Sequence, residues 1–226
     1  MTTLSRVGEI VRRHDPDRFF TSLFAPAERR GALWALYAFN HELARARESV
    51  REPMMALIRL QWWREVVEGA RRRHEIAEPL RDALDAGALR QADLIAAIEG
   101  READLPITAE AWIAYVDSTA GTVAAAAGHA LGAEEVDAIQ AAGAAYGAAG
   151  VLRNRALTGE APIAGLAEAG RTWLRTARRD RIPRRALAAA LPAVFAARDL
   201  RRTTPVRARG AGDKLAVVLA SATGRL

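Results

Sequence analysis

The sequence predicts an all-α fold, and three observations lead to this prediction. Ala, Leu and Arg, which favour helices, are abundant throughout the chain. No stretch alternates β-branched and polar residues as a strand would. Proline, glycine and capping residues recur where helices start and end. With 226 residues, half of them hydrophobic, the chain is long enough for one domain, over residues 1–226, with a sizeable core.

Breaking and capping residues divide the first half of the chain into helices. We expect a first helix over residues 4–13, ended by Asp15-Pro16-Asp17, which also caps the next. Pro26 suits the first turn of a long helix that reaches about Val50. Its inner face is formed by Leu33, Leu36, Tyr37, Asn40 and Ala44. A helix over 54–73 follows, with one stripe formed by Met55, Ile58, Trp62 and Val66. A short helix between 79 and 87 and another over 93–104 complete this half.

The second half continues the pattern. Thr108 is expected to cap a helix that runs to about Ala130, and Glu134 and Glu135 suit the start of a helix that reaches about Leu157. Residues 158–162 form a loop. Helices are then expected over 164–179, 184–201, with a kink at Pro192, and 213–222.

Composition excludes several classes of protein. There is no cysteine, so disulfides and Cys-ligated metal sites are absent. The N-terminus lacks the apolar core and cleavage site of a secretory signal, which makes a cytoplasmic location the default. The most apolar run, residues 138–152, is too short and too rich in Ala and Gly to span a membrane.

Positive charge is concentrated near the C-terminus. Residues 171–209 contain twelve arginines and two aspartates, a net charge of +10. This segregation favours an anionic partner such as lipid headgroups, diphosphates or nucleic acid, with a solvated basic face as the alternative. Few aromatics accompany the arginines, so nucleic acid is the least favoured. The residues expected to contact an anionic membrane are Arg175, Arg178, Arg179, Arg184 and Arg185, with shallow insertion of Trp173 and Phe195.

Three runs in the first third of the chain resemble one known family. They are Phe24–Pro26 (FAP), Ala35–Asn40 (ALYAFN) and Ile58–Glu65 (IRLQWWRE). They resemble the squalene/phytoene synthases, and in particular a branch that contains a mitochondrial complex I assembly factor with a phytoene-synthase-like domain. The resemblance is strongest over 17–159 and implies a single-domain, isoprenoid-synthase-like helical fold.

The resemblance also locates two metal motifs that this chain has mostly lost. Active members hold Mg²⁺ with two pairs of carboxylates, each pair one helical turn apart, to ionise a prenyl diphosphate. The aligned positions here are Ala44, Glu48, Asn154 and Thr158, so three of four carboxylates are absent. The resemblance then implies no metal site and no cofactor, with Mg²⁺ required only if the chain is an active synthase.

A pocket between the two motif helices is implied as well, and it could still accept an isoprenoid or other lipid. The residues assigned to its wall are Tyr37, Asn40, His41, Glu48, Trp62, Tyr115, Gly147, Gly150, Arg153 and Asn154. The glycine face of residues 143–154 has a second interpretation, close packing between helices, which we favour. Of the adjacent tryptophans, Trp62 and Trp63, either one lies in the core and one at a pocket, or both lie in the core.

Two functional classes follow. The first is a catalytically degenerate family member that acts by binding, at a membrane surface or with a respiratory-complex subunit during assembly of complex I. The second is an active prenyltransferase of isoprenoid biosynthesis. The missing carboxylates favour the first class, with peripheral attachment to the inner membrane.

Overall fold

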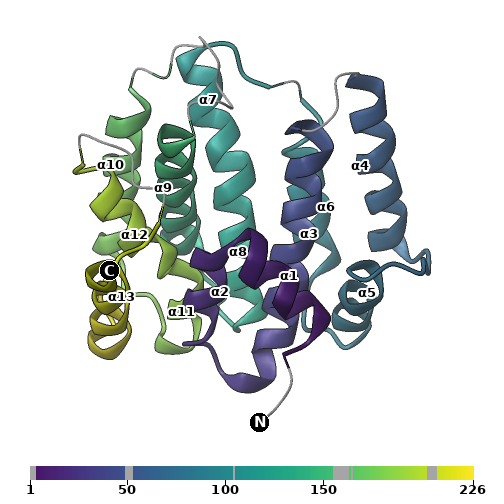
Figure 1. Cartoon of the computed structure of the whole chain (residues 1–226), viewed down its shortest axis with the longest axis horizontal. Helices are drawn as coiled ribbons and strands as arrows, with labels where there is room; N and C mark the ends of the chain where they lie inside the picture. The colour runs from purple at the N-terminus through teal and green to yellow at the C-terminus, as the bar shows by residue number, and fades with distance from the viewer. Residues whose placement is uncertain (1–3, 49–52, 104, 155–162, 164, 203–207) are drawn as a thin grey trace.

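Helix-forming residues shape the whole chain, and every regular element in the described part of this computed structural model is helical (Figure 1). The structure describes residues 4–48, 53–103, 105–154, 163, 165–202 and 208–226, without the side chains of Glu48 and Pro53. The all-α prediction is confirmed.

The first part of the chain closely follows its capping signals. Asp15 caps α2 by accepting a hydrogen bond from the backbone N–H of Arg18 at 3.1 Å. Pro26 precedes a 3₁₀ turn instead of opening the long helix directly. The helix predicted over 54–73 ends at Glu68, because Gly69 adopts φ of +130°. The elements are α1 (Arg6–His14), α2 (Pro16–Ser22), η1 (Ala27–Arg29), α3 (Arg30–Glu48), α4 (Pro53–Glu68), α5 (Ala77–Asp85) and α6 (Gln91–Glu99).

The second part differs from the prediction at two breaks. The helix expected over 108–130 is interrupted by a π-helical segment, and the one over 184–201 is divided at Pro192, which starts a new helix. Thr108 caps as expected, accepting from Ala111 N at 3.2 Å. The elements are α7 (Ala109–Val116), η2 (Asp117–Gly121), α8 (Thr122–Ala130), α9 (Asp137–Arg153), α10 (Leu166–Arg179), η4 (Arg184–Ala186), α11 (Leu187–Ala190), α12 (Pro192–Asp199) and α13 (Ala211–Thr223).

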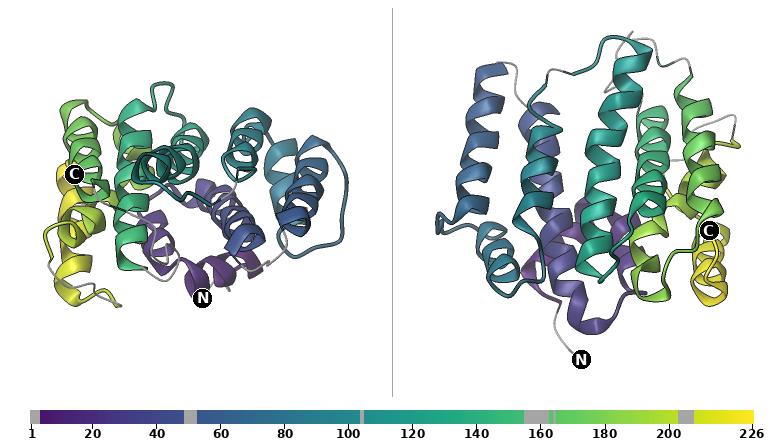
Figure 2. Two further views of the ribbon diagram at one scale, coloured as in Figure 1. Left: turned by 90° about the horizontal axis from the view of Figure 1, so that it is seen from above. Right: turned by 180° about the vertical axis from the view of Figure 1, so that it is seen from behind.

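Helices α3, α8 and α9 form the centre of the bundle (Figures 1 and 2). Helices α1, α4, α5 and α8 pack against α3, while η2, α8, α10 and α12 pack against α9. Leu33, Leu36 and Tyr37 on α3 are buried as predicted. The core is therefore continuous from one central helix to the next, and α4 and α13 lie at opposite edges.

The stripe predicted on α4 faces the core only toward its C-terminal end. Met55 and Ile58 are exposed, Trp62 is partly buried and Val66 is buried, whereas Ala56, Leu60 and Trp63 complete the inner face. Only one side of this edge helix meets α3, α5 and α6, so apolar residues on its outer side have no neighbour to cover them. Apolar spacing alone identified the helix but not its inner face.

Candidate functional site

Charged side chains are buried where α2, α9 and α12 meet. Asp17 on α2 is 7% exposed and receives two hydrogen bonds from Arg209, at 3.0 and 2.7 Å, and one from Arg153 at 3.4 Å. Arg209 also donates to Asp199 at 2.7 Å and lies 4.5 Å from the ring centroid of Phe195. We call this set, with Asp15, Arg18, Tyr37 and Tyr146, the Asp17 network. The network connects α2, near the N-terminus, with Arg209, near the C-terminus, and includes Tyr146 and Arg153 of α9.

Arg18 places a cation between α3 and α9. Its guanidinium carbon lies 5.5 Å from the ring centroid of Tyr37 and 5.1 Å from that of Tyr146. Arg18 also donates to Asp15 at 3.1 Å, and the hydroxyl of Tyr146 donates to Asp17 at 3.3 Å. A buried cation between two aromatic faces is a strong contact once its charge is balanced. Helices α3 and α9, to which the resemblance assigned the metal motifs, are therefore bridged here by an arginine.

Burial and charge shift the pKa values of this network. Burial raises the pKa of Tyr37 to about 12, with Arg18 opposing the shift. Burial raises the pKa of Tyr146 as well, helped by Asp15 and Asp17. Burial acts to lower the pKa of Arg209, but the hydrogen bonds to Asp17 and Asp199 outweigh it and raise that pKa above its usual value. The tyrosines therefore stay neutral and the arginine stays charged.

One atom of the network is incompletely satisfied. Asp199 Oδ2 lies 3.4 Å from Arg153 Nη1, an ion-pair distance, but has no hydrogen-bond partner among the residues that the structure describes. Its other oxygen is bonded by Arg202 and Arg209. Arg202 continues the network to Asp213 at the start of α13, which also accepts from Arg198 at 2.5 Å. The C-terminal helix is thereby fixed to the interior by charge.

A second polar group lies next to α3. Arg101 is 8% exposed and donates to the hydroxyl of Tyr115 at 2.7 Å and to Asn40 Oδ1 at 3.4 Å. The buried Arg47 donates to the carbonyl oxygens of Arg101, at 2.7 Å, and Glu102. Two predicted pocket residues, Asn40 and Tyr115, are thus brought together, but through a cation that the sequence analysis did not identify.

The predicted metal positions do not fit Mg²⁺ where the structure describes them. Ala44 is partly buried and offers no side-chain oxygen, and Asn154 is an exposed, neutral residue at the C-terminus of α9. The side chain of Glu48 and all of Thr158 lie outside the described residues. Among the residues that are described, no three His, Asp or Glu side chains are grouped to hold a metal ion.

The glycine face of α9 is used mainly for packing. A Cβ on Gly147 would lie 2.5 Å from Ala120 Cβ, and one on Gly143 would lie 2.6 Å from the Ala120 carbonyl oxygen. Both glycines therefore contact the α7–η2–α8 segment, so they do not oppose α3 as the resemblance implied. Gly150 differs, because its Cβ position meets no atom of another described element within 4 Å. It is Tyr146 that α9 turns toward Arg18 and α3.

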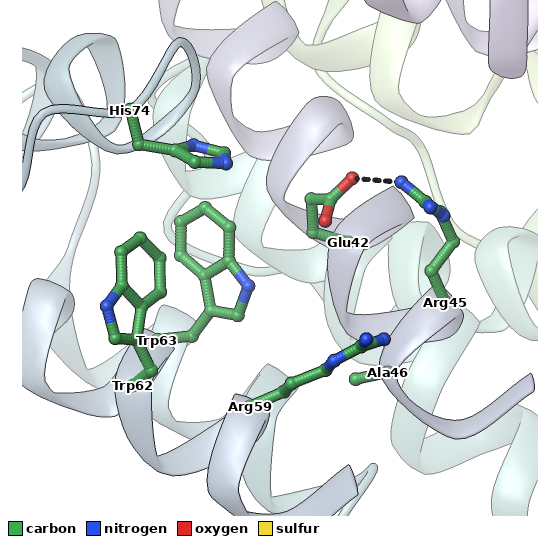
Figure 3. A pocket seen from close by; sticks show the side chains of 7 residues that line it. All are labelled: Glu42, Arg45, Ala46, Arg59, Trp62, Trp63 and His74. Carbon is green, nitrogen blue, oxygen red and sulfur yellow. Dashed lines mark hydrogen bonds and ion pairs between the residues drawn. The ribbon is translucent and has the colours of Figure 1, made fainter. Parts of the chain in front are cut away.

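A separate pocket of about 320 Å³ opens between α3 and α4 (Figure 3). Both Trp62 and Trp63 line it, although Trp63 is only 4% exposed and belongs to the core, so the two tryptophans are not divided between core and pocket. The His74 ring centroid lies 5.5 and 5.4 Å from those of the two indoles. The other lining residues are Glu42, Arg45, Ala46 and Arg59. This pocket lies on the side of α3 that faces α4, away from the Asp17 network.

The predicted wall residues are thus divided among several places. Tyr37 and Arg153 belong to the Asp17 network, whereas His41 stacks on His14 with ring centroids 4.4 Å apart. Burial lowers the pKa of His41, and His14 adds to this shift. These residues do not line one common pocket.

The five arginines assigned to an anionic surface are all exposed. Three of them also bond backbone carbonyls: Arg178 donates to Leu226, Arg184 to Ala222 and Arg185 to Gly132. Arg175 pairs with Glu168 at 3.1 Å. The predicted insertion of Trp173 and Phe195 into a membrane is wrong. Phe195 is only 1% exposed, and Trp173 packs against the core.

Sequence reasoning missed the residues that complete the buried groups: Asp17, Arg101, Asp199 and Arg209. Asp17 and Arg209 are 192 positions apart, and nothing local in the sequence pairs them. The one available signal was the presence of aspartates inside otherwise basic segments.

The family model and the similar solved structures agree on one family. The family model described as Squalene/phytoene synthase matches residues 11–157. Among solved structures, squalene synthase HpnC from Alicyclobacillus acidocaldarius superposes with a TM-score of 0.67 at 14% identity, covering 96% of this chain and 92% of that one. A dehydrosqualene synthase in complex with ligand gives a TM-score of 0.67 at 13% identity, covering 96% and 94%. These likenesses show the isoprenoid-synthase helical fold.

Curated relatives match over a shorter stretch. NADH dehydrogenase (ubiquinone) complex I, assembly factor 6, of Homo sapiens is 43% identical over 60 residues, and that of Bos taurus is 42% identical over 60 residues. The match covers 26% of this chain and 18% of each relative.

Proposed function

Because the chain belongs to the squalene/phytoene synthase family, we propose that it is a catalytically degenerate member that acts by binding, in the assembly of respiratory complex I. The observation that carries this proposal is the loss of acids at the motif positions. Ala44 and Asn154 stand where Mg²⁺ ligands would be needed. A prenyl diphosphate carries several negative charges, and its ionisation needs metal ions to stabilise the leaving group.

The interior charges support the same proposal. The buried aspartates Asp17, Asp199 and Asp213 are each paired with at least two arginines. A carboxylate already balanced in this way would have to exchange its arginines for a cation before it could hold Mg²⁺. The charges of the Asp17 network thus serve to join α2, α9 and α12.

The role in assembly is supported by the relatives. The assembly factors share more than 40% identity with 26% of this chain. Because the match covers a minor part of each assembly factor, the shared role is a proposal about this chain and not a transfer of every property.

Peripheral attachment to the inner membrane is the location that we propose. Among the helices described, none is long and apolar enough to cross a bilayer. The exposed arginines of α10 and η4 offer charge for an anionic surface. An isoprenoid or other lipid remains the class of ligand that we propose, on the resemblance to the family alone.

The catalytic part of the proposal is tested by turnover. Purified protein is incubated with Mg²⁺ and either farnesyl or geranylgeranyl diphosphate, beside an active squalene synthase as the positive control. We expect no squalene, phytoene or presqualene-type product above background. Product from this chain would overturn the assignment and establish the alternative, a prenyltransferase.

The assembly part is tested by deletion of the gene in the source organism. We expect less assembled complex I on native gels of its membranes, restored by the wild-type gene. A variant of the Asp17 network that still folds should restore it as well. Normal complex I in the deletion strain would refute the role in assembly.

A further inference from the structure

Helix α13 has two apolar faces, and only one of them is covered. Val217 and Ala220 are buried against the body of the protein, together with Asp213. On the opposite side, Leu215 is 57% exposed, Val218 42% and Leu219 57%. A spacing of three and four residues places these three side chains on one stripe of the helix. Leucines exposed to this extent on a solvent-facing helix call for an explanation.

The charged side chains around this stripe are positive. Lys214 and Arg225 are exposed on α13 and just beyond it. Arg178 and Arg184 approach the end of the helix from α10 and η4, bonding the carbonyls of Leu226 at 3.1 Å and Ala222 at 3.5 Å. A guanidinium has five N–H donors, so each of these arginines keeps donors for a second partner.

Helix α13 itself contributes no exposed acid to this surface. The one acid within α13, Asp213, is 2% exposed and is bound by Arg198 and Arg202. An apolar stripe bordered by cations on a helix that lies along the protein surface is the pattern of an interfacial membrane helix.

We propose that the outer face of α13 is the membrane-contact surface of this protein, with Leu215, Val218 and Leu219 inserted among the lipids of an anionic bilayer. This inference rests on the peripheral location proposed above and names the surface responsible. Lys214, Arg178, Arg184 and Arg225 contact the headgroups. Insertion comes from α13, in place of the Trp173 and Phe195 predicted from the sequence.

The geometry agrees with this orientation. Helix α13 lies at one edge of the bundle (Figures 1 and 2), and Leu215, Val218 and Leu219 on its outer face are exposed. Its inner face is fixed to α12 by the ion pairs of Asp213. The helix can therefore lie on a bilayer without leaving the protein.

The first test is co-sedimentation with vesicles of phosphatidylcholine alone or of equal parts phosphatidylcholine and phosphatidylglycerol. We expect the wild type to bind only the anionic vesicles and to be released by high salt. Leu215→Gln with Leu219→Gln should reduce binding at least tenfold, and Lys214→Glu with Arg225→Glu should reduce it as well.

The matched control lies on the opposite edge. Met54 and Ile58 on α4 are 65% and 54% exposed, so Met54→Gln with Ile58→Gln removes the same kind of surface elsewhere. This variant should bind as the wild type does. Helical content by circular dichroism should be unchanged in all variants, because every substituted residue is exposed.

A second readout uses the absence of cysteine in the chain. Leu219→Cys and Ile58→Cys each provide a single site for a polarity-sensitive fluorophore. On anionic vesicles, emission from position 219 should move to shorter wavelength, while emission from position 58 should not.

Three outcomes would overturn the inference. If the wild type binds anionic vesicles and the α13 variants bind equally well, α13 is not the membrane-contact surface, but the proposed peripheral location still stands. No wild-type binding to anionic vesicles would overturn the peripheral location too, without touching the absence of turnover. A wild-type dimer that Leu215→Gln with Leu219→Gln converts to a monomer would assign the face to a second copy of the chain.

Discussion

Two faces of α9 are held in place by different interactions. Gly143 and Gly147 have no side chain, which lets this face of the helix approach Ala120 closely. The other face carries Tyr146 and Arg153 into the Asp17 network, so it depends on a complete set of charges. Adding a methyl group to the packed face should therefore destabilise the protein. Removing one charged partner from the other face should destabilise it as well. Four predictions test this difference.

The largest effect is expected from Asp17→Ala. This change leaves Arg209 and Arg153 buried near one remaining acid, and breaking a buried pair costs about 3–5 kcal/mol. Urea unfolding followed by circular dichroism gives the free energy of unfolding. The surface counterpart is Glu168→Ala, whose partners Arg171 and Arg175 are exposed, and it should leave the unfolding midpoint unchanged.

The loss in Asp17→Ala should be partly recovered by a second change, Arg209→Met, which removes the uncompensated cation. If Asp17→Ala and Glu168→Ala were equally stable, the charges would contribute nothing and the contrast between the two faces would fail.

Alkaline pH should weaken the charged face next. The pKa of Tyr37 is about 12 in the folded protein and about 10 in the unfolded chain. The folded state therefore holds its proton more tightly, so stability is complete below pH ~10 and is lost as pH rises toward ~12. Two pKa units correspond to about 2.7 kcal/mol. Unfolding measured across this range should show the loss, and Tyr37→Phe with Tyr146→Phe should flatten it; an unchanged slope would exclude these tyrosines as its source.

The packed face is tested by Gly147→Ala. The added methyl would lie 2.5 Å from Ala120 Cβ and 2.9 Å from Val116 Cγ1, so neighbouring helices must move apart. Overpacking of this kind costs about 1–3 kcal/mol. Thermal unfolding should show a lower midpoint. A midpoint at or above that of the wild type would mean that α9 is not tightly packed here.

The smallest effect should have the opposite sign. Gly150→Ala introduces the same methyl group one turn further along α9, where nothing lies within 4 Å. Alanine favours a helix over glycine by about 0.5–1 kcal/mol, so this variant should be more stable than the wild type in the same assay. Destabilisation by Gly150→Ala would indicate that the position is not open.

Local rules predicted much of the fold. The caps at Asp15 and Thr108 follow from side-chain chemistry within a few residues, and both are present. Pro192 was expected to kink one helix and instead starts a new one. The π-helical segment at Asp117–Gly121 was not predictable, because the contacts around it come from other helices. One example is the hydrogen bond from Gln140 to Asp117.

The site was predictable only in part. Resemblance placed Tyr37 and Arg153 on the two motif helices, and both belong to the Asp17 network, Tyr37 through Arg18 and Arg153 through Asp17. It could not supply Arg18, Asp17 or Arg209 as their partners, since a sequence read alone gives no spatial neighbours for residues far apart. The sequence also did not indicate which side of α4 faces the core, because apolar residues recur at helical spacing on both sides of that helix.

The contact between Asp17 and Arg209 also affects how the protein is made. The 192 positions between them take about 10–40 s to synthesise at roughly 5–20 residues per second. During that interval, Asp17 can reach only its earlier partners, Tyr146 and Arg153, because its strongest partner does not yet exist. The set of contacts that holds α2 therefore becomes complete only after translation of the final segment.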